Sequence, residues 1–323
     1  MRSRLSKTLV YRWFFLLVGN ALLFAWMSSL MTAENSHAQM LSSVGRHLGP
    51  TLLAAIGMTG VIASGSIDLS VGAIVAVAGT VFGVLVHYEM PPLLCFAACL
   101  AVAWLLAYWN AWLVRLLKLP AIIITLAGLT FYRGLALVIA DMSIENFSGN
   151  ISIQKDAYHA PGLEYANSIV IVSCVAALIF VSRTKTARTW LALGDSPEAL
   201  RLAGISPNAV STSAFSFAGV FLGLAAVLVS TQVQAIEPAR LSLGFELGVI
   251  GAVVLGGTNI FGGEASWFGT LLGALFLFLL SQVLVYAGVS PYFRDVVSGG
   301  AILFVIGLDC FLHKKRKLAE ELR

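Results

Sequence analysis

The chain alternates long apolar stretches with short polar ones along most of its 323 residues. About 20 apolar residues make a helix long enough to cross the hydrocarbon core of a bilayer. The pattern therefore predicts an all-α membrane protein of about ten transmembrane helices, some of them short or broken by glycine, in one domain over residues 1–323. The predicted spans are 9–31, 51–65, 69–88, 92–117, 120–140, 168–183, 207–231, 246–257, 266–289 and 292–308.

Composition agrees with membrane burial. Hydrophobic residues make up 59% of the chain and charged residues only 11%, whereas a soluble domain carries roughly 25% charged residues. The mean hydropathy is +0.89. The first apolar stretch is longer than the 7–15 residues typical of a cleaved signal peptide, so we expect it to stay as the first span.

Charge predicts the orientation. With both termini in the cytoplasm, the inner segments hold 14 of the 20 basic residues, and the outer loops hold only Arg46, Lys155, Arg240 and Arg294. This bias follows the positive-inside rule. The longest outer loop is then 141–167. The basic tail at 309–323 is expected to rest on anionic lipid headgroups rather than on nucleic acid.

Two segments interrupt the pattern of clean spans, at 61–79 and 253–274. Each has an apolar run, a polar interruption rich in glycine, and a second apolar run. Paired interruptions in the two halves of a chain indicate a transport pathway, although they could also be tight turns in which glycine adopts positive φ. With two polar residues of neighbouring spans, the candidate pathway residues are Asp68, Ser70, Asn110, Thr125, Thr258 and Asn259.

Arg133 is an ionisable residue inside the fifth predicted span. A charge at this depth has to reach the interface or pair with another group. Asp141 and Asp295 are the candidate partners, and either a structural or a pathway role is open.

The longest cytoplasmic stretch, about 184–206, predicts a short helix from Pro197 to about Ala203. Asp195 or Ser196 can cap its start, and Gly204 suits its C-terminal end. A helix at this place can dock on a soluble partner, or it can be a loop helix that contacts only lipid headgroups.

Catalytic and metal-binding motifs are missing from the sequence. It contains no G-x-x-x-x-G-K-[ST] phosphate loop, no H-E-x-x-H motif and no Ser-His-Asp constellation. Proton-coupled pumps need several buried ionisable groups, and few are present here. We therefore expect a transport subunit, not an enzyme, that holds no cofactor of its own and takes its energy from elsewhere.

Five motifs resemble, in order, the permeases of bacterial sugar ABC importers, which serve ribose, xylose, arabinose, galactofuranose and autoinducer-2. They are GMTGVIASGSIDLSVGAIVAVAG, ITLAGLTFYRGLALVI, GDSPEALRLAGI, AVVLGGTNIFGGEASWFGTLLGA and VSPYFRDVVSGG. They run in the family's order from about residue 51 to 308, a range that takes in most of the chain. Two departures leave the substrate open: Ser-Gly-Ser at 64–66, and Glu264-Ala265 after the second Gly-Gly.

The resemblance implies a set of partners. Two permeases, identical or paired with a sister subunit, would bind two cytoplasmic ATP-binding subunits in the inner membrane, and a periplasmic binding protein would deliver the sugar. ATP would be bound by the partner and not by this chain. The EALRLAG stretch resembles the segment that seats on the ATPase, which assigns ATPase coupling to Asp195, Glu198, Ala199, Leu200, Arg201 and Gly204.

Three other functions are weighed against this one. A branched-chain amino acid permease shares the general architecture, but the GSIDLSVG segment argues against it. A secondary transporter or channel would work without ATP. An intramembrane enzyme would need a catalytic constellation, and none is present.

Overall fold

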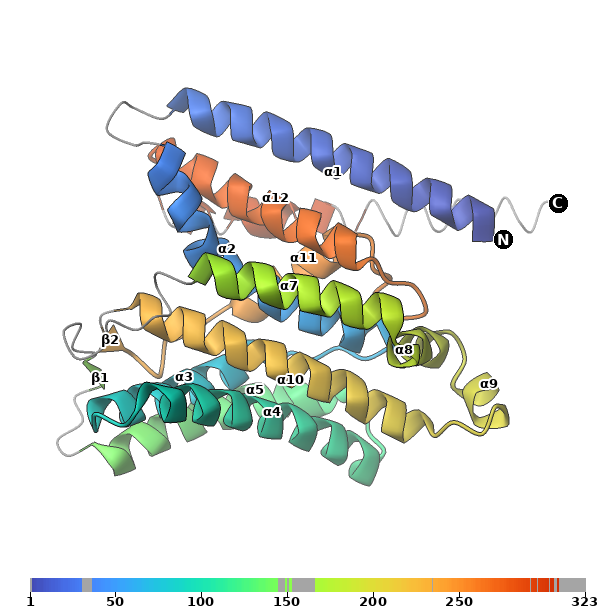
Figure 1. Ribbon diagram of the computed structural model, residues 1–323, viewed down its shortest axis with the longest axis horizontal. Helices are drawn as coiled ribbons and strands as arrows, with labels where there is room; N and C mark the ends of the chain where they lie inside the picture. The colour runs from blue at the N-terminus through green and yellow to red at the C-terminus, as the bar shows by residue number, and fades with distance from the viewer. Residues whose placement is uncertain are drawn as a thin grey trace.

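The computed structural model describes residues 2–30, 37–144, 149, 151–152, 166–233, 235–290, 292–294, 296–301, 303–304 and 307. The described part is almost wholly helical (Figure 1). Its helices are α1 (Arg2–Leu30), α2 (His37–Ala63), α3 (Val71–His87), α4 (Pro92–Leu117), α5 (Ala121–Ser143), α7 (Ala166–Arg183), α8 (Lys185–Asp195), α9 (Pro197–Leu202), α10 (Pro207–Gln232), α11 (Phe245–Leu255) and α12 (Trp267–Tyr286).

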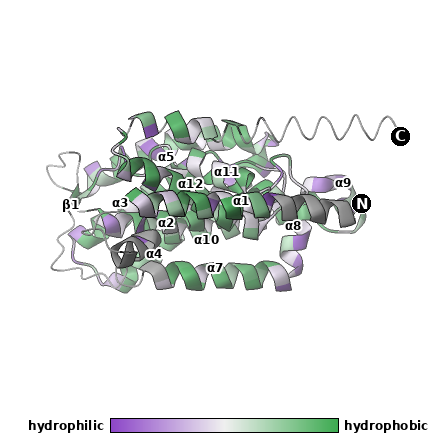
Figure 2. Ribbon diagram, turned by 90° about the horizontal axis from the view of Figure 1, so that it is seen from above, coloured by the Kyte–Doolittle hydropathy of each residue, from purple (hydrophilic) through white to green (hydrophobic). Residues whose placement is uncertain are grey.

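The long helices run roughly side by side and define two ends of the molecule (Figure 1). At one end, β1 (Ile151–Ser152) pairs antiparallel with β2 (Ala235–Ile236), with Ile151 opposite Ile236. We call this the strand end. The other end carries α8 and α9 and is called the α9 end. Figure 2 shows apolar residues along the middle of the bundle and hydrophilic residues gathered toward the two ends.

Five helical stretches are long and apolar enough to cross a membrane, at 12–30, 92–117, 121–143, 207–232 and 267–286. The pair formed by α7 and α8 passes the same test together, with a bend of 71° between them. Among the described residues this gives five or six candidate spans, so the ten predicted spans and the cytoplasmic termini stay predictions. Large side chains such as Phe15 and Leu93 are exposed on the outer helices, as expected for surfaces that face lipid.

Several boundaries differ from the sequence prediction. The second apolar run, predicted at 51–65, belongs to a helix that already begins at His37 and continues through Pro50. The stretch 184–206 holds two helices, because α8 precedes the predicted short helix. The sequence pattern did not predict α8, because α8 contains too many polar residues to resemble an apolar span. The tail 309–323 and most of the loop 141–167 lie outside the described residues.

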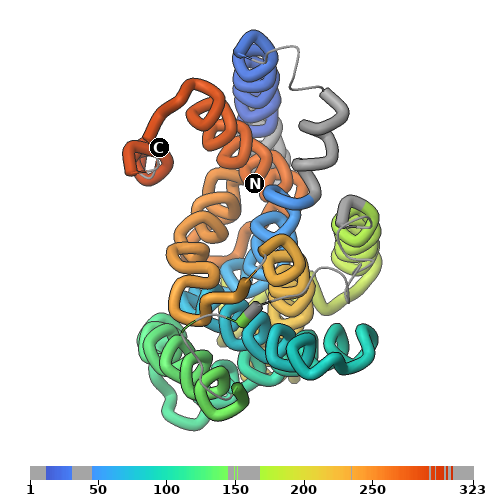
Figure 3. Tube along the Cα trace, turned by 90° about the vertical axis from the view of Figure 1, so that its left-hand side faces the viewer, coloured from blue at the N-terminus to red at the C-terminus, as the bar shows by residue number. Residues whose placement is uncertain are grey.

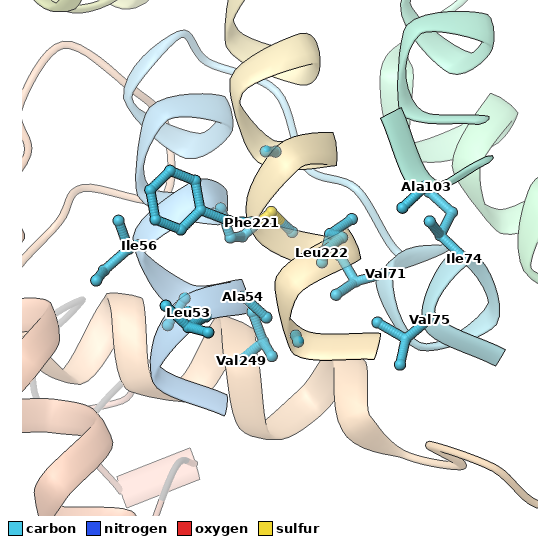
Figure 4. Close-up of a cluster of buried hydrophobic side chains, with 14 of the residues drawn as sticks. Leu53, Ala54, Ile56, Val71, Ile74, Val75, Ala103, Phe221, Leu222 and Val249 are labelled. Atoms are coloured by element: carbon cyan, nitrogen blue, oxygen red, sulfur yellow. The ribbon is translucent and has the colours of Figure 1, made fainter. Parts of the chain in front are cut away.

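The helix α10 lies at the centre of the bundle and contacts α2, α3 and α4. Small residues allow this, since helices in a membrane pack by close backbone approach. A Cβ at Gly219 would lie 2.8 Å from the Cα of Trp104, and a Cβ at Gly57 would lie 2.8 Å from the Cα of Ala218. Figure 4 shows the resulting core, in which apolar side chains of α2, α3 and α10 meet.

Gly219→Val tests this packing. The added side chain would push α4 away from α10, so we expect the free energy of unfolding to fall by about 1–3 kcal/mol, as for other overpacked cores. Thermal unfolding in detergent measures the change. Gly134→Val is the control, because a Cβ at Gly134 has nothing within 4 Å. Equal losses in the two variants would contradict the assigned packing.

Candidate functional site

The two glycine-rich interruptions lie against each other. The first follows α2 and includes Gly65, with φ of 79°, and the second includes Gly262 and Gly263, with φ of 89° and 80°. The N–H of Gly263 donates to the carbonyl of Ala63 at 3.1 Å. A Cβ at Gly262 would lie 2.8 Å from the Cα of Gly65. The interpretation of these glycines as tight turns with positive φ is thus confirmed, and the two turns are paired in space. A transport pathway at this place stays a prediction.

The C-terminal end of α8 packs against the place where the two interruptions meet. A Cβ at Gly194 would overlap the carbonyl oxygen of Ala63 and the N–H nitrogen of Gly263. Only a glycine permits so close an approach of three backbones. We call Gly65, Gly194, Gly262 and Gly263 the glycine junction. Because Gly194 is followed directly by Asp195 and α9, the chain that leads into α9 is in backbone contact with both interruptions.

The helix α9 has the predicted caps. The Ser196 side chain accepts a hydrogen bond from the N–H of Ala199 at 3.2 Å, and Pro197 occupies the first turn. Gly204 follows the helix with φ of 74°. Of the two candidate caps, the structure therefore selects Ser196, and Asp195 closes α8.

The predicted coupling residues divide between two faces of α9. Glu198, Ala199, Arg201 and Gly204 are exposed, whereas Leu200 is only 5% exposed and packs inward. Asp195, at the end of α8, is exposed as well. Leu202 is 87% exposed and was missed by the sequence analysis. Its place four residues beyond Glu198 on a short helix was the available signal. The outward surface of α9 thus combines an acid, a base and one large apolar side chain.

Three of the six candidate pathway residues form one hydrogen-bonded group beside the first interruption, and a fourth, Thr125, bonds to the backbone next to it. Asp68 Oδ1 accepts from the Ser70 N–H at 2.8 Å and from the Ser70 hydroxyl at 2.6 Å. Asn110 donates to the Ser70 hydroxyl at 2.8 Å and accepts from the Tyr132 hydroxyl at 2.7 Å. Thr125 accepts from the Leu69 N–H at 3.1 Å. Tyr132 was not predicted, because an aromatic residue in a span usually serves packing.

This polar group joins the α2–α3 connection to α4 and α5. Asp68 is 1% exposed, and the side chains of Ser70, Asn110 and Thr125 have no exposed surface. Hydrogen bonds inside a membrane protein stabilise the fold because no water is present there to bind the same polar groups. In this conformation the four residues brace three helices, and contact with a solute stays a prediction.

The other two candidates lie in the second interruption. The Thr258 hydroxyl accepts from the Ser266 N–H at 3.2 Å, and Asn259 Oδ1 accepts from the Phe261 N–H at 3.0 Å. The Ser266 hydroxyl caps α12 and accepts from the Trp13 indole at 3.0 Å. Trp13 was not predicted to take part, yet it ties α1 to this interruption.

Arg133 has partners that the sequence analysis did not name. Its guanidinium donates to the carbonyl of Leu241 and, at 2.8 Å, to that of Ser242. Glu246 at the start of α11 is the carboxylate whose charge acts on it. The proposed pairing with Asp141 is thus wrong, because the guanidinium is bound instead by the backbone carbonyls of the turn before α11. Asp295, the other proposed partner, lies outside the described residues. Arg133 therefore joins α5 to the start of α11.

The Asp68 hydrogen bonds can be tested by two substitutions. Asp68→Ala leaves both Ser70 donors unpaired in the core, which should lower the free energy of unfolding by about 1–3 kcal/mol. Asp68→Asn keeps an oxygen acceptor of the same shape and should lose clearly less. Thermal unfolding in detergent separates them. If both variants lost the same amount, the acceptor role of Asp68 would be refuted.

Comparisons with known proteins agree with this architecture. The family described as branched-chain amino acid transport system / permease component matches residues 40–306. The ribose import permease protein of Haemophilus influenzae is 29% identical over 294 residues, covering 89% of this chain and 90% of the relative. That of Escherichia coli K12 is 32% identical over 261 residues, covering 80% and 81%.

The autoinducer 2 import system permease protein of Escherichia coli K12 / DH10B is 31% identical over 261 residues, covering 80% of this chain and 75% of the relative. No solved structure matches the chain. The match spans both interruptions, α9 and the core helices, and the long apolar helices make the chain a multi-pass protein of the bacterial inner membrane. The chain therefore belongs to the family of permease components of ABC importers that includes the ribose and autoinducer 2 permeases.

Proposed function

We propose that the chain is the membrane-spanning subunit of an ATP-driven importer that carries a monosaccharide or a related small polyhydroxy compound into the cell. Relatives about 30% identical over four fifths of the chain are named for ribose and for autoinducer 2, and this observation carries the proposal. A branched-chain amino acid substrate is not favoured. ATP is bound by a partner subunit, and a second permease chain completes the pathway.

The distribution of basic residues supports a cytoplasmic position for the α9 end. Arg115, Arg183, Lys185, Arg188 and Arg201 lie on helices at or close to this end. Positive residues collect on the cytoplasmic side of membrane proteins. In this orientation both termini are cytoplasmic, the strand end faces the periplasmic binding protein, and the described helices together with residues beyond them make up the ten spans.

The surface of α9 supports the role of a contact with an ATP-binding subunit. It lies beyond the ends of α7 and α10 in Figure 1. A helix that rests on anionic lipid is expected to be rich in basic residues, whereas α9 exposes Glu198 beside Arg201. Its mixed charge and the exposed Leu202 fit a protein groove better than a lipid surface.

The proposal is tested first by measuring which energy source drives uptake. Vesicles containing the chain with its ATP-binding and substrate-binding partners are supplied with D-ribose, D-xylose, D-galactose or L-leucine. We expect ATP-dependent uptake of at least one sugar, because the relatives of the chain are permeases of ATP-driven sugar importers. Uptake should persist when ionophores collapse the ion gradients. Uptake that stopped with the gradients and ignored ATP would indicate a secondary transporter.

Coupling through α9 is tested by Glu198→Lys combined with Gly204→Pro. Proline cannot adopt the φ of 74° at Gly204 and has no N–H to donate to the Arg201 carbonyl. We expect sugar-stimulated ATP hydrolysis to fall at least tenfold, while the amount of chain in the membrane stays unchanged.

Gly288→Pro is the matched control. Gly288 has φ of 72°, donates to the Val285 carbonyl at 3.0 Å and follows α12 at the strand end. The same backbone defect is thus placed away from α9, and ATP hydrolysis should remain stimulated. Normal coupling in the α9 double variant would refute the assignment of this segment.

A further inference from the structure

A cavity of about 610 Å³ opens between α2, α11, α12 and the helical residues 296–301. It lies toward the strand end, where α11 begins and α12 approaches its end. Figure 3 looks at the molecule from that end and shows α2, α11 and α12 grouped together, and the three helices contact one another pairwise. Its volume is in the range of about 300–1,000 Å³ found for small-molecule sites.

The cavity wall carries uncharged hydrogen-bonding groups. Thr51 of α2 and Ser281 and Gln282 of α12 line it together with Ser298 and His47. The side chains of Thr51, Ser281 and Gln282 make no hydrogen bond to any other described residue. All three are partly exposed toward the cavity rather than sealed in the core. Polar groups at membrane depth that lack a protein partner require water or a ligand.

Apolar surface completes the wall. Phe278, Leu247 and Leu277 line the cavity together with the polar groups. A sugar ring presents hydroxyls at its edge and C–H groups on its faces, so a wall that has amide, hydroxyl and apolar groups is complementary to it. The lining contains no aspartate, glutamate, lysine or arginine among the described residues.

The absence of charge in this described lining bears on substrate class. A zwitterionic amino acid would bury a carboxylate and an ammonium, and each needs an opposite charge or a helix terminus. The nearby N-terminus of α11 carries the acidic residue Glu246 in its first turn. Its negative charge cancels the attraction that the positive end of the helix dipole would offer to a substrate carboxylate. A neutral polyhydroxy compound meets no such cost.

We infer that this cavity is the place where a neutral polyhydroxy substrate contacts the permease on its way through, with Thr51, Ser281 and Gln282 as the hydrogen-bonding residues. The inference rests on the proposed function. It assigns substrate contact to a site separate from the buried group around Asp68, which has no surface open to a solute. It also makes the outer half of the bundle, and not the glycine junction, the selective part of this chain.

Three conservative variants test the site: Thr51→Val, Ser281→Ala and Gln282→Met. Each removes a hydrogen-bonding group and keeps a similar or smaller volume. Losing one hydrogen bond should slow ATP-dependent uptake of the transported sugar about threefold to tenfold. Thr130→Val is the control, since Thr130 is exposed on α5 and does not line the cavity. Wild-type uptake in all three cavity variants would overturn the inference.

A labelling experiment provides a readout that a purely structural role would not change. Ser281→Cys, in a chain whose own cysteines are replaced by alanine or serine, is exposed to a water-soluble thiol reagent. We expect labelling that D-ribose or D-galactose slows and L-leucine does not. Labelling unaffected by sugar, or slowed by L-leucine alone, would overturn the inference. So would a disulfide that joins two copies of the Ser281→Cys chain through the introduced thiol, because the cavity would then be a subunit contact.

The two proposals fail in different ways. If the wild-type chain moved no sugar on ATP in the vesicles, the proposed function would be wrong and the inference would fall with it. If the wild-type chain moved sugar but the cavity variants and the labelling behaved like the controls, only the cavity assignment would be wrong.

Discussion

The close approach of three backbones at the glycine junction constrains the rest of the structure. Ala63, Gly194 and Gly263 come so near one another that a single Cβ at position 194 would overlap both neighbours. Packed protein interiors have low compressibility, so a contact this close is expected to transmit a displacement rather than absorb it. The end of α8, the turn after α2 and the turn before α12 therefore behave as one joint.

The polar groups beside the junction explain how it is held in an apolar medium. Asp68, Ser70, Asn110 and Tyr132 form a chain of hydrogen bonds that connects the first interruption to α4 and α5, while the second carboxylate oxygen of Asp68 has no partner among the described residues. Arg133 connects α5 in turn to the start of α11. In a bilayer, polar groups that lack water stabilise a fold only when they are paired in this way. The first interruption is thus fixed to the outer helices by hydrogen bonds, not by apolar packing alone, and the bond from Trp13 to Ser266 ties the second to α1.

Local chemistry made part of the fold predictable from the sequence. The caps of α9, the helical class and the positions of the two interruptions follow from residue type and spacing, and the structure agrees with them. The long approach of α2 from His37 was not predicted, because Arg46, His47 and Pro50 break the apolar pattern there. Likewise α8 is too polar to be recognised as the continuation of α7. Features that depend on packing between distant segments could not be predicted at all. Nothing near Gly194 in the sequence indicates that it touches Ala63 and Gly263, and the acceptors of Arg133 are backbone carbonyls, which every residue has.

The same three helices reach both the cavity and the glycine junction. In α2, Thr51 and Ala63 are twelve residues apart, or about 18 Å along the helix. In α12, Gln282 and Gly269 are separated by a similar length, and α11 runs from Leu247 at the cavity to the turn at Gly256. If α9 moves on contact with an ATP-binding subunit as proposed, these helices are the connections by which the movement would reach the cavity. In the proposed function, substrate contact and energy input would therefore lie toward opposite ends of the bundle, with the same three helices running between them.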